Sequence, residues 1–579
     1  MNKTLVIAEK PSVAQDIVRA LTPVAGKFDK HDDHFESEHY IVTSAVGHLV
    51  EIAAPEQFDV KRGKWSFAHL PVLPPYFELK PIDKTKSRLN AVVRLAKRKD
   101  VARLINACDA GREGELIFRL IEQYAGGSKP LGKPVQRLWL QSMTPQAIRD
   151  GFEHLRSDEQ MQGLADAARS RSEADWLVGI NGTRAMTAFN SRDGGFFLTT
   201  VGRVQTPTLS IVVEREEKIR AHRARDYWEI HAAFLAEAGE YPGKWFDPTF
   251  KKPSGEDADP DLRADRLWDQ REALAIVEAV RGQAASVTEE RKPTTQACGL
   301  LYDLTSLQRE ANGRFGFSAK TTLQLAQSLY ERHKALTYPR TDSRALPEDY
   351  LGTVKQTFEM LAGSGMAHLA PHAKTALDNH YIRPSKRIFD NSKVSDHFAI
   401  IPTLQAPHGL SEAEQKLYDL VVRRFLAVFF PSAEFMVTTR ITKVSAAPGR
   451  EAHDVSSVGA RHVHHFKTEG KVLVKPGWMA VYGKEAAEDV EGAKDGDKGQ
   501  NLVPVREGET VHTESVEAKG LKTRPPARYS EATLLGAWPA CPGLFPASLR
   551  AARRRPPACP RPPSRPAAWL RSSAPADGS

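Results

Sequence analysis

The sequence predicts a multidomain protein of the α/β plus α+β class, with an α/β domain at its amino-terminal end. Its 579 residues exceed one ordinary domain, and the usual domain size suggests about three to five. Hydrophobic residues make up 41% and charged residues 26% of the chain, a composition typical of a soluble globular protein. Strand-like apolar runs alternate with helical periodicity over residues 1–150, whereas larger helical and strand-rich blocks follow.

The amino-terminal α/β domain ends its predicted strands in charged residues. The strands are expected at Thr4–Ala8, Tyr40–Val46 and Val101–Ala107. Glu9 and Lys10 follow the first strand, and Asp109 follows the third, just before apolar residues at helical spacing. The carboxyl end of a strand, ahead of a helix, is the usual position of a site in an open α/β sheet.

The rest of the chain divides into helical and strand-rich blocks. In order, these are a helical stretch over 144–221 with a loop at 201–208, strand-like residues at 226–290, an amphipathic helix at 318–334, a helix at 411–430, a strand-rich block at 433–481 and a polar linker at 483–500.

Charge and cysteine content narrow the function classes. The net charge is +9, but residues 537–579 carry seven Arg and one Asp, so the rest of the chain is only +3. Any DNA-binding surface is therefore expected to be a local basic patch or channel. The four cysteines form no CxxC pair, so neither a zinc site nor a disulfide framework is expected. The sequence contains no signal peptide and no apolar run long enough to span a bilayer, which predicts a cytoplasmic protein.

The segment Thr337–Asp342 (TYPRTD) carries the first candidate chemistry. Pro339 favours extended backbone at the preceding Tyr338, so the side chains of Tyr338 and Arg340 can point to the same side. A phenol beside a guanidinium suits a nucleophile next to a phosphate clamp. The alternative for these residues alone is an ordinary surface turn.

Glu9, Asp109 and Glu113 form the second candidate, a metal site. Carboxylate oxygens are the hard ligands that Mg²⁺ prefers, and Lys10 is suited to neutralise a phosphate or transfer a proton. The alternative is that each residue is a solvated loop charge. Two acidic clusters at strand ends of one domain favour the metal site.

Seven short motifs occur together in one order along the chain. They are Ile7–Ser12 (IAEKPS), Ser44–Leu49 (SAVGHL), Asp109–Glu115 (DAGREGE), Val201–Leu209 (VGRVQTPTL), Leu336–Ser343 (LTYPRTDS), Ser395–Thr403 (SDHFAIIPT) and Pro525–Leu535 (PPARYSEATLL). In these motifs and their order, residues 1–536 resemble the type IA DNA topoisomerases, and most closely their bacterial topoisomerase III branch.

The resemblance implies a toprim domain at residues 1–155 and a toroidal topoisomerase body, with helical and β-rich domains, whose hole admits DNA. The other implied domains are a helical DNA-binding domain at 156–221 and 501–536, a β-rich arch domain at 222–298 and 405–500, a domain carrying the nucleophilic tyrosine at 299–404, and an aberrant basic tail at 537–579, expected to be disordered.

The resemblance also implies roles for the candidate residues. Tyr338 would attack one DNA strand and become joined to the 5′-phosphate, while Arg340 orients that phosphate and Lys10 stabilises it. Glu9 would act as metal ligand or proton donor. Asp109 and Glu113 would hold Mg²⁺, with Mn²⁺ as a substitute. The implied DNA contacts are His48, Arg171, Asp175, Arg203, Gln205, Thr206 and His397.

An enzyme of this kind relaxes negative supercoils and decatenates DNA, prefers single-stranded regions and is expected to act as a monomer. The implied partners are a helicase or a single-strand-binding protein, and the implied location is the nucleoid. No ATP is needed, because the phosphotyrosyl ester conserves the energy of the broken bond. The chain contains no G-x-x-x-x-G-K-[ST] loop, which agrees.

Two departures from the family pattern keep alternatives open. Gly111 stands where the toprim pattern has a second Asp, so weaker or rearranged metal binding is expected. Residues 537–579 hold ten Pro, ten Ala and seven Arg, and they resemble out-of-frame translation. One alternative is therefore a truncated, inactive relic that binds single-stranded DNA. Another is a toprim nuclease or primase, which would have no use for Tyr338.

Three further clusters are interpreted as structural. The histidine-rich segment His31–His39 and the group His462, His464 and His465 are expected to be polar hairpin tips and not metal sites. Trp176, Trp228 and Trp245 are expected in a core or an interface, although tryptophan can also stack on bases.

Overall fold

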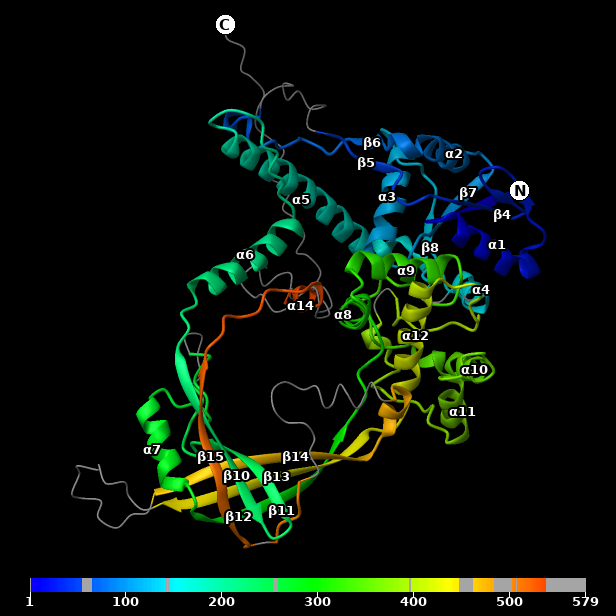
Figure 1. Ribbon diagram of the computed structural model, residues 1–579. Helices are drawn as coiled ribbons and strands as arrows, with labels where there is room; N and C mark the ends of the chain where they lie inside the picture. The colour runs from blue at the N-terminus through cyan, green and yellow to red at the C-terminus, as the bar shows by residue number, and fades with distance from the viewer. Residues whose placement is uncertain are drawn as a thin grey trace, which may run out of the picture.

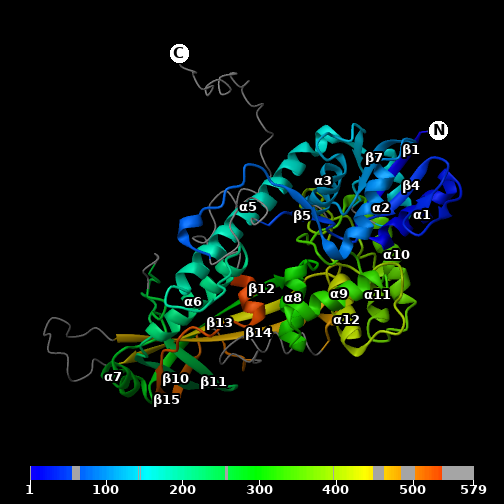
Figure 2. The same cartoon turned by 90° about the horizontal axis from the view of Figure 1, so that it is seen from above.

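The chain follows a ring built from four packed bodies. The computed structural model describes residues 2–54, 65–140, 143, 145–253, 259–394, 397–446, 462–483, 502–506 and 508–537. Figure 1 shows the α/β domain at upper right, α5 and α6 leading to a β-barrel at the bottom, and a helical domain returning beneath the α/β domain. In the turned view, α5 and α6 again lie opposite α8, α9 and α12 (Figure 2). The ring-shaped arrangement expected from the sequence is confirmed.

A mixed seven-stranded sheet forms the amino-terminal α/β domain. Its strand order is β2-β3-β4-β1-β7-β8-β9. The strands are β1 (Lys3–Ala8), β2 (Asp29–Lys30), β3 (Phe35–Glu36), β4 (Tyr40–Ser44), β7 (Val101–Ala107), β8 (Val135–Arg137) and β9 (Arg156–Ser157), and a separate pair joins β5 (Val50–Ile52) to β6 (Leu79–Pro81). The central strand β1 is parallel to both β4 and β7, with Ala8 paired to Ser44 and to Ala107. The three predicted strands therefore end at one edge of the sheet.

Helices cover both faces of this sheet. They are α1 (Pro11–Ala25), α2 (Lys86–Ala96), α3 (Arg112–Gly126) and α4 (Pro145–Glu153). One core places Ile17 of α1 and Ile148 of α4 against Val6 of β1. The other places Val92 of α2 and Ile117 of α3 on the opposite face. Apolar side chains on both faces explain why β1 is a continuous hydrophobic run and not an alternating one.

The long helix α5 (Asp158–Asn190) leaves the α/β domain and leads to α6 (Gln205–Ala221). The Ser157 side chain accepts from the Gln160 amide in a capping box, which starts α5 immediately after β9. The predicted loop at 201–208 runs into α6, as expected.

A closed barrel of six long strands lies across the ring from the α/β domain. Its order is β10-β11-β14-β13-β12-β15. The elements are β10 (Asp226–Ala236), β11 (Gly239–Phe246), α7 (Gln270–Val280), β12 (Ala284–Gln296), β13 (Ala433–Ala446), β14 (His462–Lys475) and β15 (Thr510–Lys522). Helix α7 contributes Ile276 and Val280 to the barrel core, against Phe234 and Phe466.

The fourth body is helical and carries the TYPRTD segment. Its helices are α8 (Leu304–Phe315), α9 (Ala319–Glu331), α10 (Leu351–Ala362), α11 (Ala370–Asp378) and α12 (Glu412–Ala427). The predicted helices at 318–334 and 411–430 correspond to α9 and α12. Short 3₁₀ turns lie at Phe67–His69, Asp83–Thr85, Glu348–Tyr350, Asn391–Lys393 and Gly477–Val481.

Residues 523–537 tie α6 to this helical body. The Arg215 guanidinium donates to the Tyr529 hydroxyl at 2.8 Å, and Arg528 pairs with Glu216 at 2.7 Å. The segment then ends in α14 (Glu531–Ala537), where Glu531 accepts from the Ala319 amide at the start of α9. Beyond Ala537, the expected tail lies outside the described residues. No helix in the described ranges is long and apolar enough to cross a membrane.

The barrel wall buries one arginine. The Arg440 side chain is 0% exposed, and it donates to Glu289 Oε2 at 2.7 Å and to the Val503 carbonyl at 2.6 Å. Its guanidinium also lies over the Tyr241 ring, 4.3 Å from the centroid. Glu289 has a second partner, Arg291, at 2.7 Å, but that side chain is 59% exposed. One carboxylate thus binds one buried and one exposed cation.

We expect Arg440→Met to destabilise the barrel by about 3 kcal/mol, because it leaves Glu289 and the Val503 carbonyl without their buried donor. Arg291→Met removes an exposed partner of the same carboxylate and should cost about 0.5 kcal/mol or less. Urea unfolding of the full chain, followed by tryptophan fluorescence, measures both. Equal losses for the two variants would show that burial does not set the contribution of this pair.

Candidate active site

Acidic and basic side chains meet where β1 and β7 end. Because these strands are parallel neighbours, Glu9 and Asp109 emerge side by side. The Asp109 amide donates to Glu9 Oε2 at 3.3 Å. Lys10 Nζ lies 3.4 Å from Asp109 Oδ2 and 3.9 Å from Glu9 Oε1. The structure therefore brings the predicted site residues Glu9 and Lys10 together with Asp109, which lies about 100 positions further along the chain.

The Glu9 carboxyl is poised to hold a proton. Burial, and next the neighbouring Asp109 carboxylate, raise its pKa above the usual range, while Lys10 opposes this shift. A protonated carboxyl can give up its proton to a developing alkoxide, which is the requirement for a general acid.

Glu113 is turned toward His48. His48 Nε2 lies 2.6 Å from Glu113 Oε1, and this hydrogen bond lowers the pKa of Glu113. The Glu113 side chain is 73% exposed. Its oxygens do not converge with those of Glu9 and Asp109 within 4.8 Å, a spacing that only His31, His34 and Glu36 reach among the described residues. Two of the three predicted metal ligands are thus adjacent, and the third lies apart.

A buried polar cluster beneath the site holds the Asp109 loop, and the sequence reasoning missed it. The Arg137 guanidinium, 1% exposed, donates to the carbonyls of Cys108 at 2.7 Å and Asp109 at 2.6 Å. Glu115, also 1% exposed, pairs with Arg137 at 3.3 Å and accepts from the Asn106 amide at 2.9 Å. The sequence does contain a signal for this cluster. Glu115 precedes Phe118 by one turn, so a carboxylate falls on the apolar face of a helix.

Helix α3 starts in close contact with the same loop. A Cβ atom on Gly114 would lie 2.1 Å from the Asp109 carbonyl oxygen, so this position requires glycine. Gly111, where the toprim pattern has Asp, has an extended backbone with φ 175° that any residue can adopt. Gly111 therefore removes a possible metal ligand, although the backbone does not require glycine at this position.

Tyr338 reaches this site from the helical body. Lys10 Nζ lies over its ring, 5.1 Å from the centroid, and the rings of Tyr330 and His397 pack at 5.4 and 4.2 Å. Burial, and then Asp109 and Glu9, raise the pKa of the Tyr338 phenol well above its usual range, while Arg340 opposes this. Burial also lowers the pKa of His397 to about 4, so its imidazole is neutral at neutral pH.

Backbone pairing fixes the tyrosine segment against residues 397–401. The Thr337 amide donates to the Ile401 carbonyl at 3.0 Å, and the Ile401 amide donates to Thr337 Oγ1 at 2.9 Å. The Thr341 hydroxyl donates to the His397 carbonyl at 3.0 Å. Tyr338 and His397 are therefore placed by one short paired segment.

Five of the seven predicted DNA contacts form a second group on α5 and at the start of α6. Arg203 Nε pairs with Asp175 Oδ1 at 2.7 Å. Burial, followed by the nearby Arg203 and Arg112, lowers the pKa of Arg171. The Gln205 amide oxygen accepts from Thr200 at 3.1 Å, and the Thr206 hydroxyl accepts from the Gly202 amide at 3.2 Å. Guanidiniums gathered in this way favour an anionic ligand.

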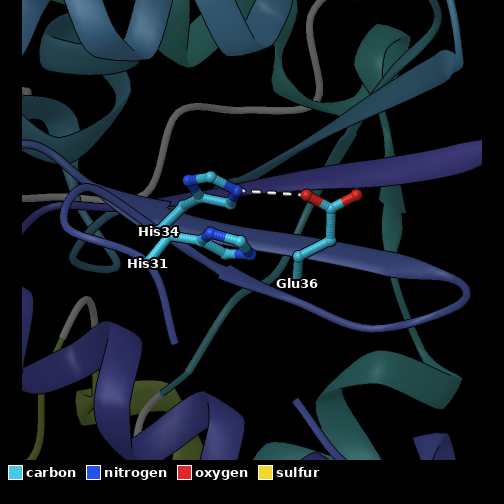
Figure 3. Close-up of side chains that lie close together, drawn as sticks. All are labelled: His31, His34 and Glu36. Atoms are coloured by element: carbon cyan, nitrogen blue, oxygen red, sulfur yellow. Dashed lines mark hydrogen bonds and ion pairs between the residues drawn. The ribbon is translucent and has the colours of Figure 1, made fainter. Parts of the chain in front are cut away.

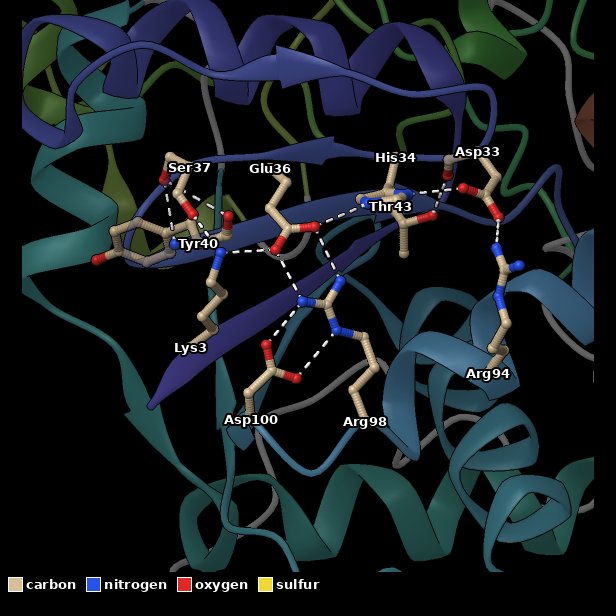
Figure 4. Close-up of polar contacts among 10 residues, drawn as sticks. All are labelled: Lys3, Asp33, His34, Glu36, Ser37, Tyr40, Thr43, Arg94, Arg98 and Asp100. Carbon is tan, nitrogen blue, oxygen red and sulfur yellow. Dashed lines mark hydrogen bonds and ion pairs between the residues drawn. The ribbon is translucent and has the colours of Figure 1, made fainter. Parts of the chain in front are cut away.

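The histidine-rich hairpin is part of an ion-pair network. His34 Nε2 lies 3.1 Å from Glu36, and the His31 ring stacks on His34 at 4.4 Å (Figure 3). Glu36 also accepts from Lys3 at 2.6 Å and from both terminal nitrogens of Arg98 at 2.8 Å (Figure 4). Arg98 and Lys3 hold the pKa of Glu36 well below its usual range. Two cations already neutralise the Glu36 carboxylate. We therefore interpret the cluster as an ion-pair network that stabilises the sheet edge, and not as a metal site.

An α/β domain with carboxylates at its strand ends, set against a tyrosine from a second domain of a ring, defines the type IA class of DNA topoisomerases. The DNA topoisomerase family model matches residues 159–539, and the Toprim domain model matches residues 4–143. The chain belongs to the type IA DNA topoisomerases.

The similar proteins are bacterial topoisomerases. DNA topoisomerase 3 of Bacillus cereus (strain ATCC 14579) is 40% identical over 542 residues, which cover 93% of this chain and 67% of that protein. DNA topoisomerase 3 of Bacillus subtilis (strain 168) is 39% identical over 543 residues with the same coverage. Full-length topoisomerase I from Thermotoga maritima has a TM-score of 0.58, with 95% of this chain and 77% of that chain covered. At 19% identity this likeness supports the fold alone.

Gly114→Ala should push α3 away from the Asp109 loop and lower the free energy of unfolding by about 2 kcal/mol, because the new methyl group overlaps a backbone carbonyl. Gly163→Ala is the matched control, since a Cβ there meets nothing within 4 Å. That control should be neutral or stabilising by up to about 1 kcal/mol, because alanine favours a helix. Urea unfolding compares the two, and equal stability would contradict the close approach.

Proposed function

We propose that this topoisomerase cuts one DNA strand with Tyr338 as the nucleophile. The phenol loses its proton to solvent as its oxygen attacks the scissile phosphorus, the bond from phosphorus to the 3′-oxygen breaks, and a 5′-phosphotyrosyl ester forms. The released 3′-oxygen takes a proton from Glu9, whose raised pKa suits a general acid. The observation that carries this proposal is the packing of Tyr338 against Lys10 beside Glu9 and Asp109.

Positive charge must assist the attack, because a buried phenol resists ionisation. Lys10 lies over the Tyr338 ring, and the attraction of Arg340 opposes the rise in the pKa of Tyr338. Both cations can also bind the scissile phosphate as negative charge develops on it. Neutral His397, packed on the same ring, can accept a hydrogen bond from DNA or from the phenol.

A toprim domain implies a divalent metal ion, and we assign Mg²⁺, or Mn²⁺ in its place, to Asp109 and Glu9. The donor set fits, because both groups offer carboxylate oxygens and their mutual repulsion would be relieved by a cation. Glu113 can join after leaving His48, whereas Gly111 offers no side-chain ligand. When bound, the ion would neutralise the phosphate and orient the 3′-hydroxyl for resealing. Zinc has no role in this proposal.

The DNA path proposed here runs along the cationic group on α5 and α6. Arg171, Arg203, Gln205 and Thr206 would contact the single-stranded segment, with Asp175 orienting Arg203. His48 would contact DNA after releasing Glu113. Contacts of this kind hold a strand by its backbone and suit a preference for single-stranded regions.

The cycle ends in resealing without ATP. Because the ester stores the energy of the broken bond, the 3′-hydroxyl can reverse the first step after another strand has passed. Relaxation of negative supercoils and decatenation are the proposed outcomes. We further propose a monomer in the cytoplasm, bound to the nucleoid and assisted by a helicase or a single-strand-binding protein.

A 3′-labelled single-stranded oligonucleotide should become attached to the protein in the presence of Mg²⁺ and stay attached after a detergent quench. Tyr338→Phe should abolish this adduct, because it removes the attacking oxygen. Tyr330→Phe is the matched control, since Tyr330 lies beside the nucleophile and should still allow adduct formation. Absence of any adduct from the folded wild-type chain would instead support the inactive relic.

Mg²⁺ should raise the unfolding temperature of the wild-type chain, because a cation relieves the repulsion between Glu9 and Asp109. At a hundredfold excess over the dissociation constant, the stabilisation should be about 2.7 kcal/mol. Asp109→Asn should remove most of this shift, whereas Glu153→Gln, an exposed acid in the same domain, should retain it. An unchanged shift in Asp109→Asn would place the ion elsewhere.

A further inference from the structure

Helix α9 lies directly behind both proposed phosphate-handling groups. Tyr330 packs edge-on against the Tyr338 ring, with ring planes at 80°. Gln327, one turn earlier on the same face, faces Arg340. With the amide oxygen turned toward the guanidinium, it accepts from Arg340 Nη2 at 3.1 Å and from Nε at 3.3 Å. This orientation satisfies both groups, whereas the opposite one sets donors against donors.

Helix α9, which carries Gln327, is held in place by buried packing and side-chain hydrogen bonds. Its neighbours Ala326 and Leu329 are both 0% exposed in the core of the helical body. The Ser328 hydroxyl donates to Glu414 Oε1 at 2.6 Å, and Glu414 itself caps α12. The Ser318 side chain caps the start of α9 by accepting from the Thr321 amide. A side chain on such a helix can hold its partner in a fixed place.

The partner of Arg340 in this contact is neutral, whereas some other arginines of the chain pair with a carboxylate. Arg203 is paired with Asp175, Arg98 with Glu36, and Arg440 with Glu289, so each guanidinium has a carboxylate partner. Within the described ranges, no carboxylate lies at ion-pair distance from Arg340. An amide oxygen accepts two N–H bonds from the guanidinium fork without cancelling its charge. Two donors on the other terminal nitrogen also remain for a phosphate.

We propose that Gln327 is a positioning residue that fixes the Arg340 guanidinium while leaving its charge available to the scissile phosphate. The inference rests on the proposed role of Arg340. It explains why a neutral residue, and not an acidic one, occupies this position. Gln327 touches Arg340 and not the phosphate itself.

The test compares Gln327→Glu, Gln327→Ala and Gln324→Glu. Glutamate has the shape of glutamine and accepts the same two hydrogen bonds, but its charge neutralises Arg340. Gln324 is exposed on α9 one turn earlier, so Gln324→Glu makes the same charge change away from Arg340. Single-turnover adduct formation is measured over a range of protein concentrations, so that the maximal rate and the half-saturating concentration are separated.

The expected order of maximal rates is wild type, then Gln327→Ala, then Gln327→Glu. The glutamate variant should lose about tenfold or more, the scale of one charge-assisted phosphate contact. The half-saturating concentration should rise by less than the maximal rate falls, because many other contacts bind the DNA. Gln324→Glu should match the wild type, and thermal unfolding should show all variants folded. In an Arg340→Ala background, Gln327→Glu should have no further effect.

A merely structural contact makes the opposite prediction. The isosteric glutamate would then retain the wild-type rate and alanine would be the slower variant, which would overturn the inference. A second measurement separates this outcome from a failure of the cleavage chemistry. Affinity for a single-stranded oligonucleotide is measured in the Tyr338→Phe background at low salt. Gln327→Glu should weaken binding relative to Gln324→Glu there, and equal affinities would also overturn the inference.

Discussion

Lys10 is the cation on which the site depends. Its ammonium lies between the carboxylates of Glu9 and Asp109 and over the ring of Tyr338. Without it, two acids and a buried phenol would share a low-dielectric space with Arg340 as their main counter-charge. The arrangement exists because β1 and β7 are parallel neighbours that end together, so the sheet topology places a charge that no local sequence pattern specifies. A site held together by one ammonium can accept a phosphate or a divalent ion by redistributing this charge.

A second layer of buried polar residues lies below the Lys10 ammonium. Arg137 and Glu115 are both 1% exposed, and their cost of burial is offset because nearly every polar atom has a partner. The Arg137 bonds end on backbone carbonyls of the Asp109 loop, and Gly114 lets α3 approach the same loop. Asp109, the proposed metal ligand, is therefore placed by residues that lie beneath the site.

The sequence allowed the three strand ends and helices α9 and α12 to be anticipated, because each rests on a local period. The approach of Glu9, Lys10 and Asp109 to one another was expected from strands that end together, and that of Tyr338 from the resemblance of the seven motifs to one family. Three features could not be predicted from the sequence. The turn of Glu113 toward His48 depends on a contact across 65 positions. The role of Arg137 depends on a short strand whose neighbour is set by the sheet order. The contact of Gln327 with Arg340 depends on helix rotation. The predicted domain boundaries stay predictions.

The order of the bodies around the ring has a mechanical consequence. The α/β domain connects to the barrel through α5 and α6, and the barrel connects to the helical body through the chain after β12 and before β13 (Figure 1). The chain reaches the helical body from the α/β domain only by way of the barrel, and side chains of the two bodies pack together around Tyr338. The junction without a direct chain connection is thus the one that carries the proposed cleavage site. Under the proposed chemistry, a movement of the helical body away from the α/β domain would open the ring and widen the gap in the cut strand together.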